Sequence, residues 1–135
     1  MLTSHAGFSI NWCSSPSILV YTFYDVTIPT VNQWAATFEA ALDQQAPGQP
    51  LLTLFDVTRI PLTVTPHMRQ LGIQTARHRP DVPGRVAIVM QHSYRSDMLR
   101  GFMSLLEKPN RGRQGAIFYL HDNAMAWLSE LEARV

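Results

Sequence analysis

Four side chains with catalytic chemistry lie close to the ends of apolar segments. Asp56, His92 and His121 each follow such a segment, and Ser93 is adjacent to His92. If the segments are parallel strands of one sheet, their carboxyl ends meet at one edge, where open α/β sheets bind ligands. Ser93, His121 and Asp56 could there act as the nucleophile, base and orienting carboxylate of a hydrolase.

The surrounding sequence favours a structural role for these side chains. No G-x-S-x-G turn or Gly-rich oxyanion loop accompanies Ser93, and both Ser93 and Asp122 are suited to cap helices. The phosphate-loop and H-E-x-x-H motifs and paired cysteines are missing, and the five histidines lack metal-ligand spacing. We therefore expect no catalytic residues, no metal and no cofactor.

Residues 51–71, LLTLFDVTRIPLTVTPHMRQL, hold the clearest change of structure. An apolar run typical of a buried parallel strand ends at Asp56, and Thr65 followed by Pro66 is typical of a helix start. The bend between them would lie at the carboxyl edge of the sheet, where open α/β sheets bind their ligands. If the chain binds a partner protein, we expect the contact to involve Asp56, Arg59, Thr63, Thr65 and His67.

The remaining pattern predicts an α/β fold in a single domain, residues 1–135. Alternating residues in 8–12 and an apolar run in 18–24 predict an N-terminal antiparallel strand pair. Thr30 and Gln33 fit a capping box at the start of the next helix, and helices and strands then alternate. The prediction is a mixed sheet of about five strands with four helices. Residues 108–115, KPNRGRQG, are expected to form a polar basic loop before the last strand.

The predicted third helix has an unusually wide apolar stripe. A one-sided helix needs roughly three to four apolar positions per two turns, and this one offers more. The stripe therefore predicts a homodimer interface or a bound apolar molecule. Its residues are Met98, Leu99, Phe102, Met103, Leu105 and Leu106.

Composition narrows the function classes further. The 135 residues carry a formal net charge of +1, which gives no general attraction to nucleic acid or to membranes. No apolar run approaches the roughly 20 residues of a membrane-spanning helix, and Cys13 is the single cysteine. We expect a cytoplasmic protein without nucleic-acid partners or an integral membrane segment.

Two stretches resemble a known family of small domains. Residues 51–71 resemble the strand, Asp-rich bend and helix start of STAS domains, and residues 122–128, DNAMAWL, are similar to the ending of SpoIIAA-like proteins. The resemblance covers nearly the whole chain and implies a STAS/SpoIIAA-like fold, related to SEC14-like lipid-transfer domains. The phosphorylatable Asp-Ser-Ser-Gly stretch of the antagonists falls on residues 64–67, where Thr65 alone keeps a hydroxyl in register.

The resemblance implies a non-enzymatic binding or regulatory domain that acts through protein–protein contacts in bacterial signalling, as anti-sigma-factor antagonists do. An alternative is a carrier of a small apolar or lipid ligand, as in SEC14-like domains, which predicts an enclosed apolar cavity. The hydrolase described above is a second alternative.

Overall fold

A computed structural model of the chain describes residues 2–5, 7–14, 17–61, 63–91, 100–101, 103–104 and 112–133. The strands are β1 (Leu2–His5), β2 (Phe8–Ser14), β3 (Ser17–Phe23), β4 (Leu51–Asp56), β5 (Gly84–Val89) and β6 (Arg113–Phe118). The helices are α1 (Ile28–Asp43), α2 (Pro66–Arg77) and α4 (His121–Ala133).

The strands form one mixed sheet of six strands in the order β1-β2-β3-β4-β5-β6. The first three are antiparallel, and β3 to β6 are parallel. The predicted antiparallel pair is therefore confirmed, with Phe8 paired to Phe23 and Trp12 to Leu19. The expected α/β fold is also confirmed, but the sheet has six strands where about five were predicted.

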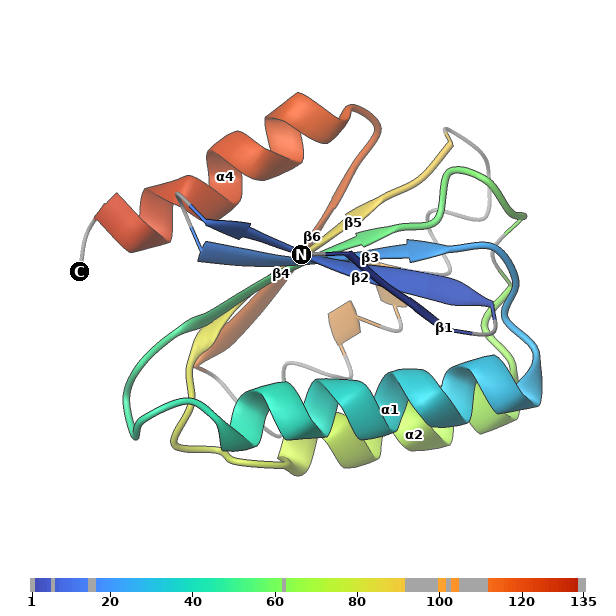
Figure 1. The fold of residues 1–135 in the computed structure, drawn as a ribbon, viewed down its shortest axis with the longest axis horizontal. Coiled ribbons are helices and arrows are strands. Elements are labelled where there is room, and N and C mark those ends of the chain that lie inside the picture. The colour runs from blue at the N-terminus through green and yellow to red at the C-terminus, as the bar shows by residue number, and fades with distance from the viewer. Residues whose placement is uncertain are drawn as a thin grey trace.

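The helices cover the sheet on both faces. In Figure 1, α1 and α2 lie side by side below the sheet and α4 lies above it. Side chains alternate along each strand, so one set packs against α1 and α2 and the other against α4. Phe55 and Ile88 belong to the first core, whereas Leu54 and Val89 belong to the second. The cavity discussed below lies in the first core.

The start of α1 differs from the predicted capping box. Thr27 is the N-cap, and Thr30 lies inside the first turn, where its hydroxyl donates to Asp25 Oδ1. Asp25 also accepts from the Thr27 backbone N–H at 3.1 Å. Pro29 in the first turn, with its φ already helical, favours this earlier start.

Two strands also differ from the prediction. No strand was predicted before the antiparallel pair β2 and β3. The structure adds β1, which precedes this pair and is antiparallel to β2. The last strand starts at Arg113, inside the segment predicted to be a basic loop, and it ends at Phe118.

The helix predicted to begin at Pro66 does begin there, and it ends at Arg77.

The final helix begins at His121, so Asp122 lies inside its first turn instead of capping it. A carboxylate in that position is still stabilised by the helix dipole. Most of the predicted third helix lies outside the described residues; Arg100, Gly101, Met103 and Ser104 are described and are helical.

Candidate functional site

Asp56 lies at the carboxyl edge of the sheet, as the sequence predicted. It is the last residue of β4, and β4, β5 and β6 are parallel neighbours. His121 begins α4 just after β6 ends, so it lies at the same edge. His92 and Ser93 fall outside the described residues. The hydrolase therefore stays an untested alternative to the expected absence of catalytic residues.

The carboxylate of Asp56 stabilises the bend that follows β4. Its Oδ1 accepts from the backbone N–H of Thr58 at 2.9 Å and from the Thr58 hydroxyl at 2.6 Å. This is the side-chain-to-backbone turn that aspartate commonly forms. Oδ1 is thus already used within the chain.

Thr65 caps α2, which confirms that part of the prediction. Its backbone is extended, and its Oγ1 accepts from the backbone N–H of Met68 at 3.1 Å. Pro66 follows in the first helical turn. Phosphorylation would place a charged group on the oxygen that now accepts this bond.

The other residues of the predicted protein-binding segment are spread over the same bend and helix start. His67 Nε2 lies 2.7 Å from Asn32 Oδ1 and so connects α2 to α1. The Arg59 guanidinium lies 5.6 Å from the centroid of the exposed Tyr24 ring, and Thr63 is exposed. Binding of a partner protein here stays a prediction.

Met103 is buried in its own chain. It is 7% exposed and belongs to the core between the sheet and the helices α1 and α2. Its burial therefore needs no second copy, and the homodimer stays a prediction without support from this residue. The other residues of the predicted apolar interface, Met98, Phe102, Leu105 and Leu106, lie outside the described part of the chain.

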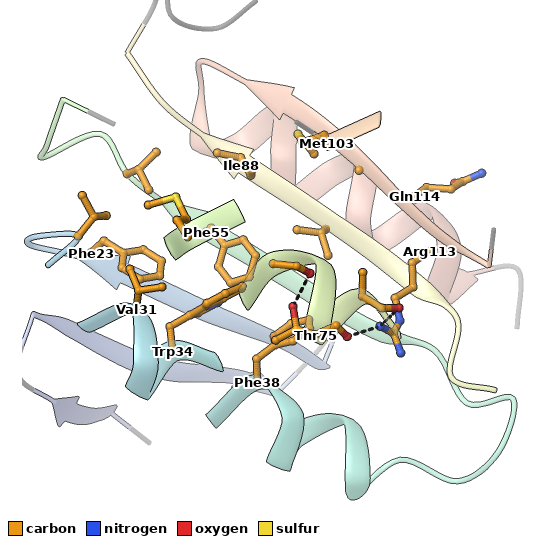
Figure 2. Close-up of a pocket in the computed structure, with 17 residues that line it drawn as sticks. Phe23, Val31, Trp34, Phe38, Phe55, Thr75, Ile88, Met103, Arg113 and Gln114 are labelled. Atoms are coloured by element: carbon orange, nitrogen blue, oxygen red, sulfur yellow. Dashed lines mark hydrogen bonds between the residues drawn. The ribbon is translucent and has the colours of Figure 1, made fainter. Parts of the chain in front are cut away.

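An apolar cavity of about 150 Å³ lies between the sheet and the helices α1 and α2. Figure 2 shows its aromatic wall, to which Trp34 and Phe38 of α1 and Phe55 of β4 contribute, with Met103 and Ile88 on another side. The cavity extends from Phe23, Val26, Val31, Val57 and Met68 near the carboxyl edge to Arg113, Gln114 and Gly115 at the start of β6.

Small residues on α2 leave the space open. Gly72, Thr75 and Ala76 line the cavity where a packed helix would present larger apolar side chains, and Gly115 faces them from β6. The lipid-carrier alternative predicted an apolar cavity, but sequence reasoning did not place it between the sheet and the helices α1 and α2. The combination of small residues on one helix with aromatic residues on its neighbour is the signal that could have indicated it.

The aromatic wall is held by contacts among rings from three elements. The ring of Phe55 lies 5.8 Å from that of Trp34, edge to face, and 5.9 Å from that of Phe38. Tyr21 of β3 stands 5.2 Å from Phe55 on the other side. Such pairs contribute about 0.5–1.5 kcal/mol each beyond the burial of their area. These contacts connect α1 to β4 and β4 to β3.

Arg113 forms the end of the cavity at the start of β6. It is 9% exposed, and each of its five N–H groups donates to a backbone carbonyl at the end of α2 or just after it. Burial lowers the pKa of its guanidinium. The bonds run from Nε to Val82, from Nη1 to Thr75 and Ala76, and from Nη2 to His78 and Arg79.

Arg79, which precedes β5, and Arg85, which lies in β5, also have structural partners. Arg79 donates to the carbonyls of Leu42 and Gln45 at the end of α1 and pairs with Asp81 at 2.9 Å. The guanidinium of Arg85 packs over the Trp127 ring at 4.7 Å. These cations hold the ends of helices and the α4 layer together.

Comparison of the chain with protein-family models, with curated proteins and with solved structures found no match. Among the described residues, no group of three or more His, Cys, Asp or Glu side chains could hold a metal ion. Nor does any helix within the described ranges have the length and apolar character needed to cross a membrane. The cavity is thus the feature of the described structure with the clearest capacity to bind a ligand.

Proposed function

We propose that this protein is a non-enzymatic binding domain that encloses a small apolar molecule between its sheet and the helices α1 and α2. The observation that carries the proposal is the apolar cavity of about 150 Å³. An apolar cavity of that size in another protein stays dry and binds benzene. The resemblance to SEC14-like domains implies the same class of ligand.

The energetics of packing support this proposal. Protein interiors contain few voids larger than a water molecule, and each cubic ångström of apolar cavity costs about 24 cal/mol. The space here is only partly enclosed, so leaving it empty costs less than a sealed void of the same volume would. A bound apolar molecule would recover much of that free energy, because it restores the missing contacts.

Trp34 provides a direct test, because it lines the cavity while Trp12 and Trp127 do not. We suggest titrating a Trp12→Phe/Trp127→Phe variant with hexan-1-ol and following the fluorescence of Trp34. We expect a saturable change in the emission maximum or intensity. A folded variant whose emission stays constant up to the solubility limit of hexan-1-ol would contradict the proposal.

The same titration with a Trp34→Phe/Trp127→Phe variant is the control. Trp12 is 40% exposed and lies outside the cavity wall, so its emission should not show a saturable change. A response of Trp12 equal to that of Trp34 would indicate general adsorption of the alcohol.

A further inference from the structure

The polar side chains of the cavity wall are nearly all engaged within the protein. The Thr75 hydroxyl donates to the carbonyl of Gly72 at 2.9 Å, and Gln114 Oε1 accepts from Arg85 Nε at 3.1 Å. Trp34 Nε1 is buried and has no acceptor among the residues that the structure describes. It is a neutral donor and would give a ligand one hydrogen bond at most.

Arg113 is the one fully charged group among the lining residues named above, and its geometry prevents it from binding an anion. A guanidinium recognises a carboxylate or phosphate through two parallel N–H groups. Here all five N–H groups already donate to carbonyls, at distances between 2.6 and 3.3 Å. Figure 2 shows two of these bonds, which direct the guanidinium toward the end of α2.

The positive charge of Arg113 is also partly balanced without a ligand. The carbonyls of Thr75 and Ala76 belong to the last turn of α2, where the helix dipole places partial negative charge. An anion entering the cavity would have to break existing bonds to reach the charged donors of Arg113, and the neutral Trp34 N–H would remain the one buried side-chain donor without a partner among the described lining residues. A cation would meet the guanidinium charge and an apolar wall.

We infer that the cavity selects ligands whose enclosed part carries no charge, because the one guanidinium among the described residues of its wall is committed to the backbone at the end of α2. This inference rests on the proposed function and specifies its ligand class. An ionised group moved into apolar surroundings without a partner loses several kcal/mol of solvation. Arg113 therefore forms one end of the cavity wall and does not anchor an acidic ligand.

Three six-carbon compounds of matched shape test this inference. We suggest measuring the dissociation constants of hexan-1-ol, hexanoate and hexylammonium for the wild-type protein at pH 7 by isothermal titration calorimetry. We expect hexan-1-ol to bind and both ions to bind at least tenfold more weakly. Hexanoate binding as tightly as hexan-1-ol, or more tightly, would overturn the inference and leave the proposed function standing. If none of the three binds, the proposed function itself fails and the inference falls with it.

An Arg113→Lys variant tests the assigned role of the guanidinium. Lysine keeps the charge but has three donors on a flexible stem, so its ammonium is free to turn toward a bound anion. We expect the ratio of the hexanoate and hexan-1-ol dissociation constants to fall at least threefold. An unchanged ratio in a folded variant would overturn the role given to Arg113. If the variant does not fold, the three wild-type measurements decide the question.

Discussion

Thr65 illustrates how the polar residues of the sequence are used at the scale of single side chains. It fits both a helix cap and the phosphorylation position implied by the resemblance, and the structure places its oxygen on the backbone N–H of Met68. Asp56 and Asp25 likewise accept hydrogen bonds from nearby threonines. These side chains stabilise turns and helix starts. This structural role accounts for their residue types and spacing without a catalytic role.

Replacing Thr65 with alanine should lower the free energy of unfolding by about 0.5–2 kcal/mol, because the capping bond to Met68 is lost. Urea-induced unfolding followed by circular dichroism measures the change. A Thr65→Ser variant keeps the hydroxyl and should lose clearly less stability than the alanine variant. Equal losses in the two variants would show that the cap contributes little.

Tyr21 makes stability depend on pH in the alkaline range. It is fully buried, its hydroxyl lies 2.9 Å from Thr37 Oγ1, and burial raises the pKa of Tyr21 to about 12. In the unfolded chain the pKa is about 10, so the folded state holds this proton more tightly. The contribution is fully present below pH 10 and is lost as the pH rises from 10 toward 12, a total of roughly 2–3 kcal/mol.

Unfolding free energies measured at intervals between pH 9 and pH 12 check this prediction. A Tyr21→Phe variant should show a shallower decline than wild type over this range. Tyr24 is 52% exposed, so Tyr24→Phe should decline as steeply as wild type. The account of Tyr21 is wrong if Tyr21→Phe loses stability with pH as fast as wild type does.

At the scale of elements, α2 determines whether the cavity is present. Ala76 lines the cavity from α2, and Ala126 is exposed on α4. An Ala76→Leu variant should partly fill the cavity, raise the free energy of unfolding by about 0.5–2 kcal/mol and weaken hexan-1-ol binding at least tenfold. The matched Ala126→Leu variant should leave both quantities nearly unchanged, and unaltered binding by Ala76→Leu would contradict the assigned position of the ligand.

Local patterns predicted elements better than they predicted their ends. The period-two alternation in β2, the apolar run of β4 and the Thr65–Pro66 start of α2 are each set by near neighbours, and all three were predicted. The strand β1, with the sequence LTSH, offers few strand-forming residues and depends on pairing with β2. Its existence is therefore decided by tertiary contacts.

The burial of Arg113 and the position of the cavity were beyond sequence reasoning for a related reason. A segment as polar as residues 108–115 reads as a loop, yet Arg113 is buried because five carbonyls more than thirty residues earlier in the chain accept its donors. The cavity likewise depends on how side chains of α1, α2 and the sheet fail to fill the space between them. Both arrangements combine residues far apart in the sequence, so no single segment is enough to predict either of them.

At the scale of the whole molecule, the two faces of the sheet differ in how they are filled. The α4 face packs Ile18, Leu54 and Leu128, all 0% exposed, whereas the opposite face holds the cavity beside an equally well buried Tyr21. The α4 layer is thus closely packed, whereas the other layer combines a buried core with the cavity in which we propose that a ligand binds. This division predicts that ligand binding affects one core and leaves the other unchanged.

Methyl NMR during a titration with hexan-1-ol tests this central claim most directly, because it reports on both cores in one experiment. We predict saturable chemical-shift changes in methyl groups that line the cavity, those of Val31, Val57, Ile88 and Met103, and negligible changes in the α4-side methyl groups of Ile18, Val89 and Leu128. Shifts that spread equally over both cores, or no shifts at the solubility limit of the alcohol, would contradict the proposal that this protein binds an apolar molecule between its sheet and the helices α1 and α2.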